Sequence, residues 1–84
     1  MNWELEARRI LRSELVRHGI TYQGLAMRLQ AIGLEETHRS VANKLSRGTF
    51  SFVFFLQCMK AMGVESLIVG LGAENPRITE SVSS

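Results

Sequence analysis

A chain of 84 residues with 45% apolar and 21% charged side chains has the composition of one small folded domain. This composition excludes a disordered chain, a collagen and a disulfide scaffold; the single cysteine, Cys58, cannot form an intramolecular bridge. No apolar run is long enough to span a membrane, and the charged first residues precede no apolar signal segment. The sequence therefore predicts a cytoplasmic protein with no membrane partner.

The net charge of +2 is distributed unevenly along the chain. Residues 1–6 and 65–84 are acidic, whereas residues 7–64 contain nine Lys or Arg against three Glu. No acidic residue occurs between His38 and Val64. A basic middle segment predicts a polyanionic partner, and an ordinary solvated surface is the alternative explanation.

The first part of the chain has the apolar periodicity of two helices. One helix is predicted over residues 3–18, with Asn2 as its N-cap, and a second over residues 22–32, with Thr21 as its N-cap. Each predicted helix is followed by a glycine, which is the residue that most readily adopts the left-handed conformation at a helix end.

A third helix, over residues 38–47 with Thr37 as its N-cap, has a polar outer stripe. On a helical wheel, Arg39, Asn43 and Arg47 fall on the side opposite the apolar residues. Arg can bind the O6 and N7 atoms of guanine, and Asn can bind the N6 and N7 atoms of adenine. A helix with this stripe and no acidic residue suits the major groove of DNA; a polar solvent face is the alternative.

The fourth predicted helix, over residues 52–62, is apolar almost all round. Ser51 is its expected N-cap, and Phe50 is expected to pack on Phe55 as a hydrophobic staple. A helix with so few polar residues is typical of a protein core or of an interface.

For the last part of the chain, the structure is predicted from the residue composition. Residues 66–71 are apolar and partly β-branched, which predicts a strand or an extended packing arm. From Gly72 onward the composition turns to Gly, Glu, Asn, Pro and Ser, which predicts a flexible tail over residues 73–84. The predicted fold is a compact all-α domain of four or five helices over residues 1–72, with one short C-terminal strand as an option.

The residue types that carry catalysis or bind metals are few and separated. His18, His38 and Cys58 lack the spacing of metal ligands, and no glycine-rich phosphate loop is present. Cys58 falls among apolar residues, as expected of a buried and inert thiol. We therefore expect no enzyme activity, no cofactor, no metal and no small-molecule substrate.

Three segments together resemble a known DNA-binding fold. They are GITYQGLA (19–26), ANKLSRG (42–48) and the apolar helix over 52–62. Over about residues 8–63 the chain resembles a lambda-repressor-like helix-turn-helix domain of the Cro and phage-repressor type. The resemblance implies that the helix over 38–47 inserts into the major groove while the helix over 22–32 crosses the DNA backbone.

The resemblance also implies roles for individual residues. Arg39 and Asn43 would contact base edges. Contacts to phosphates would come from the start of the second helix and from the third helix: Thr21, Tyr22, Gln23, Lys44 and Arg47. Helix N-termini contribute to such contacts through their free backbone N–H groups.

Two positions differ from the pattern of that family. Tyr22 stands where the family has a Gln, which occurs one place later as Gln23. Gln30 stands where the family has the glycine of the turn, and Gly33 comes three residues later. The second helix is therefore expected to be longer by nearly a turn, about 4.5 Å.

A second resemblance covers the chain from Trp3 through KLSRGTF (44–50) and LQC (56–58). These segments are similar to a small bacterial family described only as a domain of unknown function. This resemblance implies nothing about activity.

A homodimer is expected, because one recognition helix covers only a half-site. The apolar residues of 52–62 also exceed what one small core can absorb, which favours an interface. The candidate interface residues are Phe54, Met62, Leu67 and Val69. Burial within a monomer, under the tail, is the alternative.

The leading functional hypothesis is a small DNA-binding transcriptional regulator of bacterial or phage type that binds double-stranded DNA as a homodimer. The alternative is a helical protein-interaction or dimerisation module that does not bind DNA.

Overall fold

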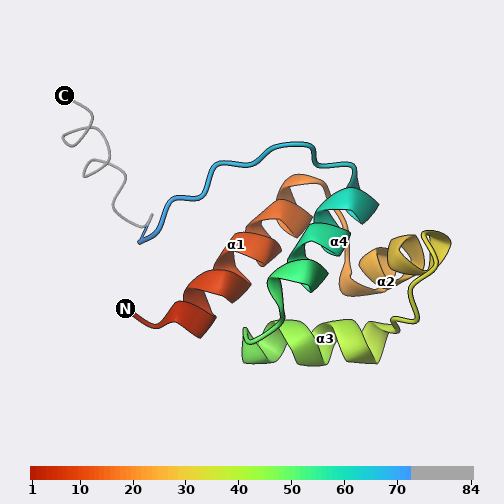
Figure 1. The fold of residues 1–84 in the computed structure, drawn as a ribbon, viewed down its shortest axis with the longest axis horizontal. Helices are drawn as coiled ribbons and strands as arrows, with labels where there is room; N and C mark the ends of the chain where they lie inside the picture. Colours follow the sequence, from red (N-terminus) through yellow and green to blue (C-terminus); the bar gives the residue numbers. More distant parts are fainter. Residues whose placement is uncertain (73–84) are drawn as a thin grey trace.

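The computed structural model describes residues 1–72; the predicted tail, 73–84, lies outside the described residues. Four helices follow one another: α1 (Trp3–Arg17), α2 (Tyr22–Ala31), α3 (His38–Arg47) and α4 (Phe52–Met62) (Figure 1). Residues 1–72 contain no strand, so the prediction of a small all-α domain is confirmed.

Each helix begins after the N-cap residue that the sequence predicted. The side chains of these residues each accept a hydrogen bond from the backbone N–H three residues further on: Asn2 from Leu5, Thr21 from Gly24, Thr37 from Ser40 and Ser51 from Phe54. Such bonds satisfy N–H groups that have no acceptor within the helix. The ends of α1 and α2 come one residue earlier than expected, with His18 and Ile32 as C-caps.

The inner faces of the four helices meet in one core. α2 packs on α3 and α4, and α1 packs on α3. The buried apolar side chains are Leu11, Leu15, Leu25, Ala26, Leu29, Val41, Leu45, Phe54, Cys58, Met59 and Met62. This core therefore draws on every helix, and it leaves the outer faces of α3 and α4 uncovered by the rest of residues 1–72.

Two of the expected interface residues belong to this core. Phe54 is 4% exposed and Met62 is 6% exposed, so their assignment to a dimer interface is wrong. The physical reason is that both side chains project from the inner face of α4 into the core cluster, where Phe54 packs on Phe50 and faces the Lys44 ammonium. Leu67 is partly buried against the same core, whereas Val69 is half exposed.

The start of α1 is fixed against the end of α3. The C-cap of α3, Gly48, is buried and has the left-handed φ of 68°. A Cβ atom at this position would overlap the carbonyl oxygen of Glu4, so only glycine allows the two segments to approach so closely. Nearby, the Arg8 guanidinium donates a 3.2 Å hydrogen bond to the carbonyl oxygen of Ser46, one of the last carbonyls of α3.

The predicted strand over 66–71 does not form. Residues 64–72, the C-terminal arm, run back from α4 toward the N-terminal half of α1 (Figure 1). Arg9 donates a 2.7 Å hydrogen bond to the carbonyl oxygen of Gly70, and the Glu6 carboxylate accepts one of 3.2 Å from the N–H of Gly72. The arm is thus the extended packing arm that was the alternative, because side chains of α1 take the place of a partner strand.

The same contacts change the acidity of Glu6. Its hydrogen bond from the backbone of Gly72, together with the hydrogen bond from Arg9, holds the pKa of the Glu6 carboxyl below its ordinary value. The ionised carboxylate is therefore the form that ties the arm to α1.

The aromatic residues at the start of α4 pair differently from the prediction. Phe50 packs on Phe54, with ring centroids 5.8 Å apart, rather than on Phe55. Phe55 instead stacks with Phe52, at 6.1 Å. The staple therefore engages the third helical residue, and Phe52 and Phe55 form a second ring pair.

Candidate nucleic-acid interface

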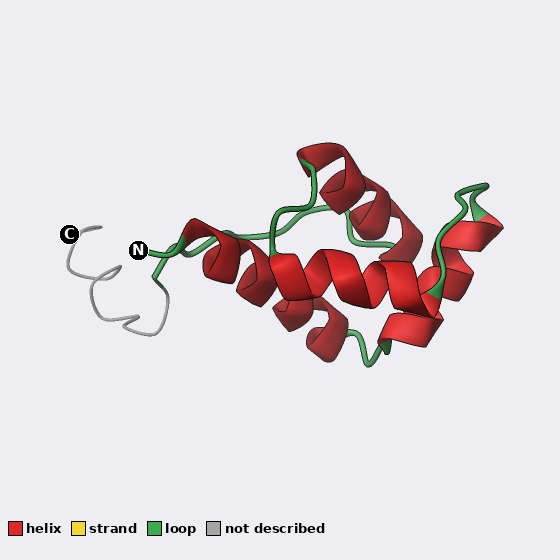
Figure 2. Cartoon of the chain, turned by 90° about the horizontal axis from the view of Figure 1, so that it is seen from below, coloured by secondary structure: helices red, strands yellow, loops and turns green. Residues whose placement is uncertain are grey.

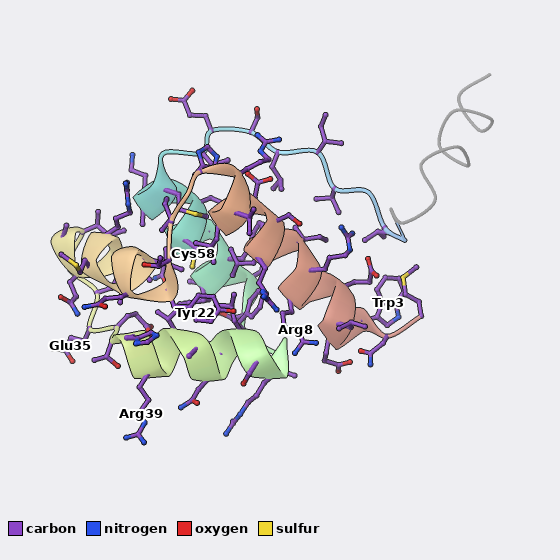
Figure 3. All side chains as sticks on the ribbon, turned by 180° about the vertical axis from the view of Figure 1, so that it is seen from behind. Trp3, Arg8, Tyr22, Glu35, Arg39 and Cys58 are labelled. Carbon is purple, nitrogen blue, oxygen red and sulfur yellow. The ribbon has the colours of Figure 1, made fainter. Side chains whose placement is uncertain are left out.

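The outer face of α3 carries the predicted polar stripe. Arg39, Asn43 and Arg47 are all exposed, while Val41 and Leu45 on the opposite side of the helix are fully buried. Figure 3 shows the Arg39 side chain extending away from the body of the molecule. The two predicted base-reading residues are therefore brought together with Arg47 on one accessible surface.

The start of α2 lies beside this surface. In Figure 2, which looks toward α3 from below, the end of α1 and the beginning of α2 are on one side of α3 and the beginning of α4 is on the other. Gln23 is exposed, and Tyr22 is half-buried with its ring 6.4 Å from the ring of His38 at the start of α3. Thr21 is occupied as the N-cap, accepting from Gly24 at 3.0 Å.

Lys44 differs from the other predicted phosphate ligands because its ammonium group is already engaged. It contacts the carboxylate of Glu36 and lies 4.8 Å from the centroid of the Phe54 ring. Glu36 also accepts a 2.6 Å hydrogen bond from the hydroxyl of Ser40. A phosphate would have to compete with Glu36 for Lys44.

The contacts of Glu36 also determine its ionisation. Burial raises the pKa of the carboxyl, but the hydrogen bonds from Lys44 and Ser40 outweigh burial and lower the pKa overall. Its main chain is fixed as well, since Gln30 donates a 2.6 Å hydrogen bond to the Glu36 carbonyl oxygen. The connection between α2 and α3 is therefore held at its end next to α3.

A hollow of about 450 Å³ lies beside the C-terminal half of α3. It is lined by Ser40, Asn43, Lys44, Arg47, Thr49, Phe50 and Ser51. Ser51 was predicted as an N-cap, but its sequence position alone does not place the start of α4 next to Asn43 and Arg47. The tight turn through residues 48–51 brings these groups together, and its glycine was the available signal.

Arg8 is a further cation at this surface, and it was not among the predicted DNA contacts. Its bond to the Ser46 carbonyl places it at the end of α3, where it lines a small hollow together with Arg47. Figure 3 shows its side chain near the C-terminal end of α3. No local pattern could reveal this position, because it depends on how α1 packs against α3.

The described residues offer little for other kinds of chemistry. Within residues 1–72 no cluster of three potential metal ligands occurs, and none of the four helices has the length and hydrophobicity to cross a bilayer. Cys58 is fully buried, and burial raises the pKa of its thiol to about 12. The thiol therefore stays protonated, as expected of an inert core residue.

Residues 1–72 are thus a small all-α domain whose third helix exposes a basic, acid-free face. The family described as Domain of unknown function (DUF6471) matches residues 3–67, and the chain belongs to this family. The match spans all four helices and the first part of the arm, and it confirms the second of the two resemblances. No curated protein and no solved structure matches the chain significantly.

Proposed function

We propose that this protein binds double-stranded DNA by inserting α3 into the major groove, as a small helix-turn-helix regulator that acts by binding and not by catalysis. The observation that carries the proposal is the exposed stripe of Arg39, Asn43 and Arg47 on a helix without acidic residues. An exposed face with no functional constraint would usually mix charges of both signs.

The dimensions of the stripe fit base reading. Arg39 and Asn43 are one helical turn apart, about 6 Å along the axis, which corresponds to about two base-pair steps. Arg39 would bind a guanine and Asn43 an adenine, since these pairings are bidentate in the major groove. Arg47, at the end of the stripe, is better placed to contact a phosphate.

Helix starts on both sides of α3 supply further phosphate ligands. The first-turn N–H groups of α2 and α4 carry the positive end of a helix dipole, which attracts anions. Gln23 lies at the start of α2, and Thr49 lies at the hollow next to Arg47. With α3 between them, the two helix starts would face the two phosphate backbones that border the groove (Figure 2).

The connection between α2 and α3 differs from the usual helix-turn-helix turn. Residues 32–37 form it, whereas the turn in such motifs has about three or four residues. The bond from Gln30 to the Glu36 carbonyl and the contact of Glu36 with Lys44 compensate for the added length. They fix the start of α3 and so define its inclination to α2.

The proposal includes a homodimer, because a single α3 would cover one half-site. A protein-interaction module without DNA binding is the second candidate. One observation favours it: the outer face of α4 exposes Phe52, Val53 and Leu56, which no other part of residues 1–72 covers.

A titration of a labelled random-sequence duplex at several salt concentrations tests the DNA proposal. The wild-type protein is expected to bind with micromolar affinity, weakening as salt rises. The Arg39→Ala/Arg47→Ala variant should bind more weakly, with a salt slope reduced by about 1 to 2.

The control is Arg12→Ala/Arg28→Ala, which removes the same charge from exposed positions on α1 and α2. Its affinity and salt slope should stay close to those of the wild type. Absence of binding at low salt, or equal losses in the two double variants, would contradict the DNA proposal and favour the interaction module.

A further inference from the structure

An apolar groove runs between α4 and the C-terminal arm. The groove has a volume of about 590 Å³. Phe52 and Val69 line one end, Leu56 the middle, and Lys60 and Glu65 the other end. Phe52 is 70% exposed and Leu56 and Val69 are each 50% exposed, so large apolar groups of both walls face solvent.

The outer face of α4 is not needed for the core of the monomer. The inner face of the same helix already buries Phe54, Cys58 and Met62. Exposed apolar groups that gather in one groove are typical of an interaction site, whereas single exposed ones have no such meaning.

The surface charges indicate which face can contact a second copy of the chain. The outer face of α1 is lined by four arginines and one glutamate, and the outer face of α3 carries two arginines, so copies would repel each other through either face. The groove has one cation and one anion, Lys60 and Glu65. Two copies can therefore meet through the groove without net repulsion.

The spacing along α4 is also self-complementary. Phe52 and Lys60 lie four residues on either side of Leu56, so the three side chains form one ridge along the helix. If two such ridges pack antiparallel, Leu56 meets its own copy, and Lys60 of each chain meets the ring of Phe52 of the other. A lysine ammonium is attracted to the face of an aromatic ring, so this pairing is electrostatically favourable.

We infer that the occupant of the groove is a second copy of this chain, packed with α4 against α4 about a two-fold axis that passes by Leu56. This inference deepens the homodimer of the proposed function, and it replaces Phe54 and Met62 by residues of the outer face. Its test uses no DNA, so the dimer and DNA binding can fail separately.

The first test is the mass of the 84-residue protein in solution as a function of concentration. The wild type is expected to shift from the monomer mass of 9.4 kDa to twice that mass in the micromolar range. Leu56→Lys, which puts two like charges on the axis, should raise the dimer dissociation constant by at least about tenfold. Val16→Lys, at a 78% exposed position on α1, is the matched control and should leave it unchanged.

The second test uses the symmetry itself, because a residue on a two-fold axis meets its own copy. Leu56→Cys should form a disulfide-linked dimer on mild oxidation, whereas Val16→Cys should not. The native thiol of Cys58 is buried and does not interfere. Far-ultraviolet circular dichroism checks that each variant keeps its helices.

Several outcomes would overturn the inference. If the wild type stays monomeric at millimolar concentration, a second copy does not occupy the groove, and its occupant is another segment or another protein. A dimer that Leu56→Lys does not weaken, or that Val16→Lys weakens instead, would place the interface on another face. Equal cross-linking of the two cysteine variants would show random collision rather than a defined axis.

Discussion

The outer faces of α3 and α4 differ in chemistry although the helices are neighbours of similar length, with 10 and 11 residues. Their inner faces are alike: Val41 and Leu45 of α3 lie in the same core as Phe54 of α4. Outside, α3 presents arginine and asparagine, whereas α4 presents phenylalanine and leucine. Packing in the core thus constrains the shared inner side, and both proposals, DNA binding by α3 and self-association through α4, rest on the outer sides.

A substitution in the turn between α3 and α4 is expected to have the largest effect on stability, because this turn sets the position of both helices. Gly48→Ala adds a Cβ atom that overlaps the backbone of Glu4 at a position with positive φ. Left-handed strain and overpacking together should lower the free energy of unfolding by about 3 kcal/mol. Urea denaturation followed by circular dichroism measures this loss.

A matched control for this substitution exists at the end of α4. Gly63 has a similar φ of 76°, but a Cβ atom there meets nothing within 4 Å. Gly63→Ala should therefore cost only the conformational strain, about 1–2 kcal/mol. If the two variants lose the same stability, the close approach of α1 to α3 is not what requires glycine at position 48.

A smaller effect is expected from single substitutions on the outer face of α3, and it separates base-contacting from phosphate-contacting residues. Once a preferred DNA site has been selected, Asn43→Ala should lose about 1–3 kcal/mol of discrimination at a single base pair. Arg47→Ala should weaken binding to all sequences alike and reduce the salt slope by about 1. Binding to a panel of single-base-pair variants of the site separates these results; loss of discrimination in Arg47→Ala and not in Asn43→Ala would reverse the two roles.

The smallest expected effect concerns the ion pair at the edge of α3. The pKa of Glu36 is lowered in the folded protein, so its contribution to stability is complete above its ordinary pKa near 4.5 and is lost as the pH falls through the folded-state value. Glu36→Gln should cost less than about 1 kcal/mol at neutral pH, because Lys44 is partly exposed. The difference from the wild type should vanish at low pH.

Thermal unfolding of wild type and variant between about pH 3 and 7 measures this dependence. Glu35→Gln, exposed on the same connection, is the control and should follow the wild-type curve. A wild-type advantage over Glu36→Gln that persists undiminished in acid would mean that the carboxylate charge does not stabilise the fold.

Features determined within one turn of helix were predictable from the sequence. The helix starts followed from single N-cap residues, because a Ser, Thr or Asn side chain satisfies a nearby N–H whatever the tertiary structure. The polar stripe of α3 followed from helical periodicity alone. Family membership agrees with the second resemblance, while the DNA-binding role inferred from the first stays a prediction.

Features determined by packing were not predictable in the same way. Periodicity shows that α4 is apolar all round but not which side α2 covers, so Phe54 and Met62 were placed in an interface. The β-branched run of the arm indicates extended backbone, but its polar groups meet α1 side chains and not another strand. Lys44 looks like a free cation until the fold brings Glu36 against it.

The contact between the start of α1 and the end of α3 has a consequence for the order in which the helices fold. Arg8 and Ser46 are 38 residues apart, whereas α2 and α3 are separated only by a short connection. Closing the longer loop costs more chain entropy, so we expect α2 and α3 to associate before α1 docks. α1, which precedes α2 and α3 in the chain, would then dock after those two helices have associated, and the chain would gain most of its helical content before the end of α3 is aligned.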